Sequence, residues 1–295
     1  MKLITELVHD TLQNNPDVRS VLAVSSANRL SPITDGFDVL LLIVTGRQSL
    51  VHHTIHYIRE HTSIQERWLD EAAIERWIVS GENRAIIQWI VEGAICIDRD
   101  DYLLGLRKRL LAFPVAMRNQ KLFIEFSLFL KTYMQAKKYV KDGHILDAYS
   151  CILESLIHWA RIAIVEAGFH PEITVWQQLK KINPGIYKLF EELTENGETM
   201  EQRVQLVLLA CEFHVLSKME TCCRLLLDVL GSREEPFAPN ELLVHPDIQQ
   251  VHVHINLALV LKKLVSRGLV REQFKLMDDA GAAETLTVQY TLETL

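Results

Sequence analysis

The chain has 295 residues, of which 48% are hydrophobic and 23% are charged, and its formal net charge is −7. This length and composition predict a globular protein of two or three domains, and the acidic balance argues against broad nonspecific attraction to nucleic acid. The sequence opens with no signal-like segment and contains no uninterrupted apolar run near the ~20 residues that span a bilayer, so we expect a cytoplasmic protein without membrane contact.

The N-terminal part of the chain alternates between helical and extended patterns. Apolar spacing and turn residues predict, in order, a helix over 3–12, strands over 18–24 and 37–44, a helix over 49–61, a strand over 64–69, helices over 71–79 and 83–91, and a strand over 93–98. Strands separated by helices indicate an α/β or α+β domain. A last helix begins near Tyr102, and Pro114 ends it, so this domain is expected to cover residues 1–115.

Two of these strands flank a polar turn and an acidic loop, in residues 21–44, which read VLAVSSANRLSPITDGFDVLLLIV. The segment resembles the signature of the polymerase-β-like nucleotidyltransferase superfamily, in which a Gly-Ser turn is followed by Ser-Asp-x-Asp at the start of the second strand. Ser25-Ser26 would stand for Gly-Ser, and residues 35–38 for the acidic motif. In that motif two carboxylates share one face of a strand and grip Mg²⁺, which activates nucleotidyl transfer.

The acidic motif departs from the superfamily pattern by one residue. Aligning the apolar run places the first acid position on Gly36, so Asp35 is one residue early and only Asp38 is in register. A one-residue slip turns a strand side chain to the opposite face. A β-bulge at Gly36 would restore Asp35, because glycine accepts the backbone angles that a bulge needs. Without the bulge, half of the metal site is missing.

A second segment, residues 92–103, carries a further resemblance. It is similar to the strand and helix that close the catalytic domain of kanamycin nucleotidyltransferase-type enzymes, where a Gly-led apolar strand ends in Asp, here Asp98, and Tyr-Leu opens the next helix. The resemblance implies a third carboxylate on an intervening strand, and Glu66 is the best match. It therefore implies Mg²⁺ on Asp38 and Glu66, with Asp35 as a third catalytic acid if the bulge forms. Ser25, Ser26 and Arg29 would contact the triphosphate of an NTP.

The middle of the chain is helical almost throughout. Breaks near residues 142–143, 168–171, 184–185 and 196–197 divide residues 116–232 into a bundle of about five helices. The resemblance implies a substrate-side domain here, because such enzymes pair the catalytic sheet with a helical bundle. The five cysteines are scattered without CxxC spacing, and no histidine pair has a third ligand, so we expect no zinc, no haem and no disulfides.

The C-terminal part, residues 240–295, follows a linker rich in proline, glycine and charge. It is predicted to form a helix over 255–267 and strands over 269–276 and 285–292, which is the closing half of a winged-helix module. The cations that would contact DNA or a protein partner are Lys262, Lys263, Arg267 and Arg271. The acidic tip between the strands repels a DNA backbone, so DNA, a protein partner and a homodimer contact stay open.

The sequence thus predicts an α+β multidomain protein with a nucleotidyltransferase-like mixed sheet, a central helical bundle and a winged-helix-like C-terminus. This order is similar to that of nucleotidyltransferase-like proteins of Gram-positive bacteria. The main hypothesis is a catalytically degenerate protein that binds a nucleotide as a sensor or regulator. The alternatives are an active Mg²⁺-dependent transferase acting on a small molecule or protein, and a protein-interaction module without a ligand.

Overall fold

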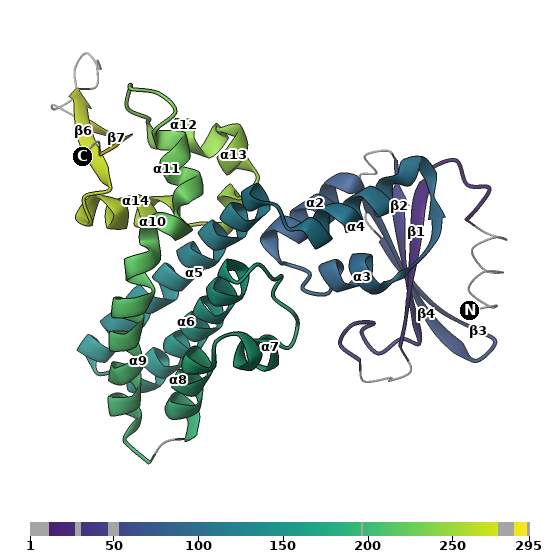
Figure 1. Ribbon diagram of the computed structural model, residues 1–295, viewed down its shortest axis with the longest axis horizontal. Coiled ribbons are helices and arrows are strands. Elements are labelled where there is room, and N and C mark those ends of the chain that lie inside the picture. The colour runs from purple at the N-terminus through teal and green to yellow at the C-terminus, as the bar shows by residue number, and fades with distance from the viewer. Residues whose placement is uncertain (1–11, 27–30, 47–52, 196, 277–285, 294–295) are drawn as a thin grey trace. The chain divides into compact units, whose positions relative to one another are not determined.

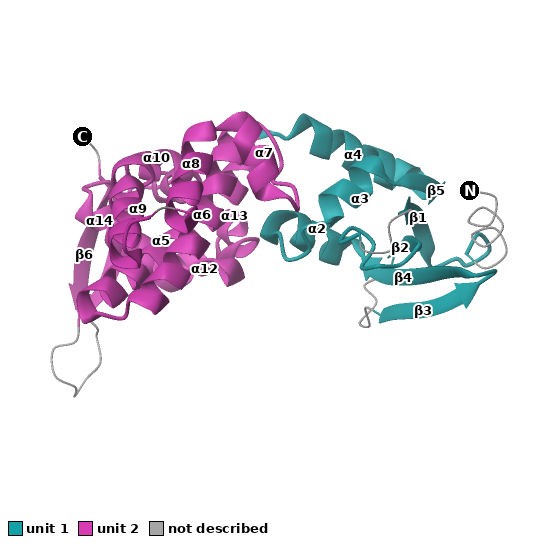
Figure 2. Cartoon of the chain, turned by 90° about the horizontal axis from the view of Figure 1, so that it is seen from below, with its two compact units in different colours: residues 1–114 teal, residues 115–295 magenta. Residues whose placement is uncertain are grey.

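The computed structural model describes residues 12–26, 31–46, 53–195, 197–276 and 286–293. It divides into two compact units, residues 1–114 and residues 115–295, which Figure 2 shows in two colours. The helix predicted over 3–12 lies, apart from Leu12, outside the described residues.

The first unit is built on a mixed five-stranded sheet with the order β3-β4-β2-β1-β5 (Figure 1). The strands are β1 (Val18–Ser25), β2 (Val39–Thr45), β3 (His53–Arg59), β4 (Thr62–Asp70) and β5 (Ala94–Asp98). β2 pairs in parallel with β4, and the other neighbouring strands pair antiparallel. The four strands predicted from apolar runs are therefore present, each within two residues of its expected bounds.

The helix predicted over 49–61 is wrong, because residues 53–59 form the edge strand β3. Ile55 and Ile58 are spaced as on a helical stripe, but both are exposed at the sheet edge. β3 and β4 form a hairpin whose two turn residues, Glu60 and His61, have φ of 50° and 65°. Two successive positive φ values are typical of the tight turn that joins antiparallel strands, and pairing with β4 overrides the local pattern.

Three helices of the first unit pack on one face of the sheet: α2 (Glu71–Ser80), α3 (Ile86–Glu92) and α4 (Tyr102–Ala112) (Figure 1). A short 3₁₀ turn, η1 (Arg99–Asp101), precedes α4. The carboxylate of Asp98 accepts hydrogen bonds from the amides of Leu103 and Leu104 at 2.9 and 3.0 Å, so the acid that ends β5 also caps α4. Both faces of β2 are buried, since alternate residues meet these helices or a second apolar cluster around Leu12.

The second unit is mainly helical and is centred on two long helices, α5 (Val115–Asp142) and α6 (Ile145–Glu166) (Figure 1). The following elements are α7 (Val175–Ile182), α8 (Pro184–Glu195), α9 (Met200–His214), η2 (Leu216–Lys218), α10 (Met219–Cys222) and α11 (Arg224–Leu230). Gly143 has a φ of 79° and separates α5 from α6 as predicted. By length and composition α6 could cross a bilayer, but 67% of its apolar window is buried within the fold, which is the pattern of a core helix.

The C-terminal residues belong to this second compact unit. They form α12 (Pro239–Val244), α13 (Pro246–Gln249), η3 (His252–His254), α14 (Leu257–Ser266), β6 (Val270–Leu276) and β7 (Leu286–Leu292). The predicted helix followed by an antiparallel hairpin is confirmed by α14 and the β6–β7 pair. Phe237 and Tyr290 exchange backbone hydrogen bonds of 2.8 Å, which ties the segment before α12 to the hairpin.

Candidate functional site

The polar turn and the acidic loop meet at one end of the sheet in the first unit. Ser25 pairs with Val39 in the β1–β2 register, and the amide of Ser26 donates to the carbonyl of Asp38 at 3.0 Å. Ser25 is exposed at this end. The structure therefore brings Ser25, Ser26 and Asp38 together, whereas Arg29 lies outside the described residues.

The carboxylate of Asp38 is engaged with the start of the neighbouring strand β4. Its Oδ2 accepts hydrogen bonds from the amide of Ser63 at 2.8 Å and from the Ser63 hydroxyl at 2.7 Å. The amide of Asp38 in turn donates to Ser63 Oγ at 3.0 Å. These three hydrogen bonds hold the first residues of the parallel β2–β4 pair together. Asp38, which was predicted to bind a metal, therefore stabilises the start of the sheet.

Glu66 lies on the opposite face of the sheet from Asp38. The β2–β4 register places Glu66 beside Leu41 and Gln65 beside Leu40, and side chains alternate between faces along a strand. Glu66 is 8% exposed, and its two oxygens accept hydrogen bonds from the hydroxyl of Tyr57 at 2.7 Å and the indole N–H of Trp68 at 3.1 Å. The predicted metal pair of Asp38 and Glu66 is thus not brought together, because Glu66 is one residue out of phase.

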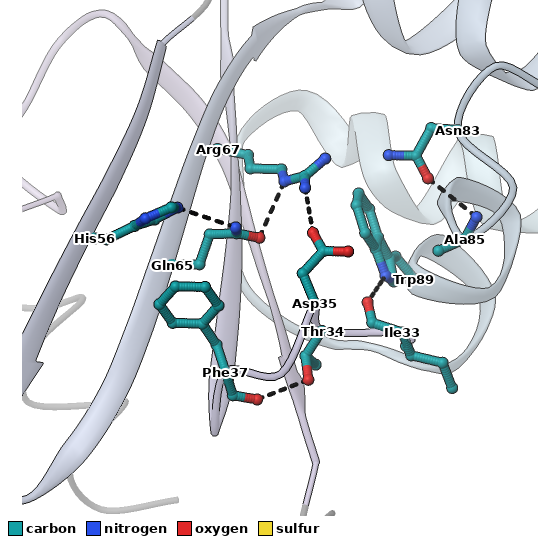
Figure 3. A network of polar contacts seen from close by, with 10 residues as sticks. All are labelled: Ile33, Thr34, Asp35, Phe37, His56, Gln65, Arg67, Asn83, Ala85 and Trp89. Carbon is teal, nitrogen blue, oxygen red and sulfur yellow. Dashed lines mark hydrogen bonds and ion pairs between the residues drawn. The ribbon is translucent and has the colours of Figure 1, made fainter. Parts of the chain in front are cut away.

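Asp35 precedes the strand instead of lying in it. Its φ is 50° and that of Gly36 is 86°, so the two residues form a left-handed turn three residues before β2 begins at Val39. The carboxylate of Asp35 forms an ion pair with Arg67 of β4, and the Arg67 Nε donates to Gln65 Oε1 at 3.0 Å (Figure 3). The bulge that would align Asp35 with Asp38 is therefore absent from these residues. A turn takes its place, and the Asp35 carboxylate pairs with the Arg67 guanidinium.

One aromatic ring lies against this arginine, and two more lie beyond Gln65. The Arg67 guanidinium lies over the ring of Trp89, 5.2 Å from its centroid, and the Trp89 indole donates to the carbonyl of Ile33 at 2.7 Å (Figure 3). On the other side Gln65 contacts His56 at 3.1 Å, and the ring of Phe37 lies 4.6 Å from that of His56. We call Asp35, Gln65, Arg67 and Trp89 the Arg67 cluster.

The Arg67 cluster fits an anion better than a metal ion. Mg²⁺ needs oxygen ligands, and within the described ranges no group of three or more His, Cys, Asp or Glu side chains is placed to hold a metal. The carboxylate nearest the cluster centre, Asp35, is already paired with a guanidinium, which repels a cation. A guanidinium beside polar and aromatic groups is instead suited to phosphate oxygens. Side chains two residues apart on a strand share a face, so Gln65 and Arg67 lie on the same face as Ser63. This alternation could have identified Gln65 and Arg67 from the sequence.

Comparisons with known proteins match segments of both units to described families. Residues 1–118 match a family model described as nucleotidyltransferase-like, and residues 119–218 match one described as a YgxA-like substrate binding domain. The uncharacterized protein YgxA of Bacillus subtilis (strain 168) is 33% identical over 270 residues, which cover 92% of this chain and 91% of that protein. The chain belongs to the nucleotidyltransferase-like family. The crystal structure of a nucleotidyltransferase-like protein from Exiguobacterium sibiricum 255-15 matches 99% of this chain and 100% of its own, with a TM-score of 0.86 and 28% identity.

The YgxA-like substrate binding domain contains a buried charged cluster that the sequence reading missed. Glu125 of α5 accepts a hydrogen bond from His158 Nδ1 of α6 at 2.6 Å, and its other oxygen is 3.5 Å from Arg161 Nη1. Burial opposes ionisation of Glu125, but the hydrogen bond from His158 and the charges of Arg161 and Lys121 lower the pKa of its carboxyl. Burial lowers the pKa of the Lys121 amine to about 8, although Glu125 partly offsets this effect. The Glu125 carboxylate therefore interacts with Lys121, His158 and Arg161 inside the bundle.

The four predicted contact cations of the C-terminal module differ in their surroundings. Lys262 is exposed. Burial and the charges of Arg267 and Lys137 lower the pKa of Lys263, whereas the charge of Glu212 raises it. Arg271 is paired with Glu293 through its Nε at 2.9 Å, and this hydrogen bond raises its pKa. The acidic tip, residues 278, 279 and 284, lies outside the described residues. Lys262, Lys263 and Arg267 therefore form the C-terminal basic area, whereas Lys137 and Arg271 are ion-paired with Glu212 and Glu293.

Proposed function

We propose that the nucleotidyltransferase-like domain binds a nucleotide through its phosphates, carries out no metal-dependent transfer, and acts as a sensor or regulator. The observation that carries this proposal is the ion pair between Arg67 and Asp35 on the face of the sheet that Asp38 occupies. A fixed guanidinium attracts phosphate oxygens and disfavours a bound Mg²⁺ at the same place.

The carboxylates support the same proposal. Mg²⁺ would need Asp38 together with Glu66 or Asp35, but Glu66 lies on the other face and Asp35 is paired with Arg67. Asp38 alone, hydrogen-bonded to Ser63, offers one carboxylate, and a two-ion site cannot be assembled from it among the described residues. The residues present therefore do not fit the metal that the superfamily uses, and no step of the proposed function depends on it.

Phosphate binding would use the exposed turn and the guanidinium. Ser26 follows the exposed Ser25 where β1 and β2 meet, and its amide lies against Asp38; the strand register puts the side chain of Ser25 on the face of Val39, opposite Arg67. The Arg67 side chain is 22% exposed and lies beside the half-exposed Asp35. The partly exposed ring of Phe37 offers a face on which a base could stack, whereas Trp89 is 1% exposed and packs against the Arg67 guanidinium.

Equilibrium binding of ATP, GTP, CTP and UTP in the presence of EDTA tests the proposal. We expect at least one NTP to bind without Mg²⁺, and Arg67→Gln to weaken that binding by roughly tenfold or more, because a charged hydrogen bond to phosphate is lost. The matched control is Arg76→Gln, which changes an exposed arginine of α2 and should leave affinity unchanged. Melting temperatures of the unliganded variants separate a binding defect from a folding defect.

Two results would overturn the proposal in different directions. Mg²⁺-dependent transfer of a labelled nucleotidyl group, abolished by Asp38→Asn, would establish an active enzyme. Absence of binding by all four NTPs, with and without Mg²⁺, would leave the domain as an interaction module.

A further inference from the structure

A pocket of about 400 Å³ opens between α6, α8, α9 and η2 of the second unit. Its lining residues are Trp159, Asn183, Ile186, Leu189, Ala210, His214 and Lys218, with Gly185 at the rim. All of them lie within residues 119–218, the segment that matches the YgxA-like substrate binding domain. The volume falls within the range of roughly 300–1,000 Å³ that is usual for small-molecule sites.

The walls of the pocket are largely apolar and well fixed. Trp159 is 4% exposed and Ile186 is 6% exposed, so these two side chains form a rigid base. The ring of His214 stacks on that of Trp159 with centroids 5.9 Å apart and an interplanar angle of 23°. Leu189 and Ala210 complete the apolar wall, and His214 and Lys218 lie at the exposed rim. Such a base favours a flat or compact apolar group.

The polar side-chain groups around this base are mainly hydrogen-bond donors. Glu166 holds the Lys218 ammonium at 2.5 Å, which leaves further N–H groups on the same nitrogen. Asn183 Oδ1 accepts from the amide of Ile186 at 3.2 Å, and its NH₂ group can donate to a ligand.

We propose that this pocket binds a small, mostly apolar carboxylic acid in its ionised form. The apolar part lies against Trp159 and Ile186, and the carboxylate accepts hydrogen bonds from Lys218 and Asn183. A cationic ligand is disfavoured because it would meet the Lys218 ammonium, and a neutral carbonyl accepts a weaker hydrogen bond from that ammonium than a carboxylate does. This ligand is distinct from the nucleotide proposed for the first unit, and neither proposal depends on the other.

Three probes of matched shape test the proposal: phenylacetate, phenylacetamide and phenethylamine. Ligand-observed NMR on the full-length protein, with probes up to about 10 mM, measures weak dissociation constants. We expect phenylacetate to bind about tenfold more tightly than phenylacetamide, and phenethylamine not to bind. Lys218→Met should remove the preference for phenylacetate, whereas Lys188→Met, which changes an exposed lysine of α8 outside the pocket, should preserve it.

Filling the pocket tests the location. Ala210→Phe should abolish binding of phenylacetate, and Leu189→Trp provides a second way of blocking the space if the first variant does not fold. Equal affinities for the three probes, or phenylacetate binding that survives a folded blocking variant, would overturn the proposal. Failure of all three probes to bind would overturn it as well.

Discussion

Replacing Lys121 with methionine tests the charge balance of the buried cluster in the helical unit. Lys121 is 7% exposed, and burial lowers the pKa of its amine from 10.5 to about 8. At about 1.36 kcal/mol per pKa unit, the difference between these values corresponds to about 3 kcal/mol. This energy is the cost of keeping the amine charged inside the fold, with the attraction of Glu125 already included.

The sign of the pH dependence follows from the lowered pKa. Between pH 8 and pH 10.5 the unfolded chain holds a proton on Lys121 that the folded protein has largely released. The free energy of unfolding should therefore rise with pH across this window, and the full penalty is present below pH 8. Lys121→Met keeps a similar chain length without the charge, so the variant should be more stable than the original protein at pH 7.

Urea unfolding at pH 7 and near pH 10, followed by circular dichroism, measures the effect. We expect Lys121→Met to raise the free energy of unfolding at pH 7 by up to about 3 kcal/mol, and the advantage to shrink towards pH 10. Lys131→Met changes an exposed lysine of the same helix and serves as the control. A difference between variant and original protein that does not change with pH, or a variant that is less stable at pH 7, would refute the reasoning.

Three further predictions concern local features of the fold. Asp98→Ala removes the carboxylate that caps α4 and should lower the free energy of unfolding by about 1–2 kcal/mol, while Lys108→Ala on the exposed side of α4 should have little effect. His61→Gly should raise stability by about 1 kcal/mol, because His61 holds a φ of 65° that glycine adopts without strain; chemical denaturation that shows a loss would contradict this. If the C-terminal basic area contacts DNA, affinity should fall steeply with salt, and combined Lys262→Ala and Lys263→Ala should flatten the slope; binding independent of salt would indicate a protein partner.

Much of the fold could be predicted from the sequence, because buried runs and breaks carry strong local signals. The strands around residues 18–24 and 37–44 and the helix before the C-terminal hairpin are of this kind. The edge strand β3 could not be recognised, since five of its seven residues are exposed and it contains no buried run. Its extended conformation depends on pairing with β4, which is a contact outside the local sequence.

The candidate site was harder to predict, because its chemistry depends on which face each side chain occupies. Motif resemblance placed Asp38 next to Ser26, as the structure shows. The resemblance also implies an acid on a later strand, where Glu66 is the best match, but the register puts Glu66 of β4 on the other face. The ion pair of Asp35 with Arg67 joins residues 32 positions apart, and no local pattern reports such a contact.

Nucleotide affinity with and without metal tests the central proposal most directly. Titration calorimetry would measure the dissociation constant of the best-binding NTP in EDTA and again in excess Mg²⁺, for the original protein and for Asp38→Asn. A site built on Arg67 predicts binding in EDTA that is at least as tight as in Mg²⁺, and only a small effect of Asp38→Asn. Binding that requires Mg²⁺ and is lost in Asp38→Asn would contradict the account and point to a working metal site.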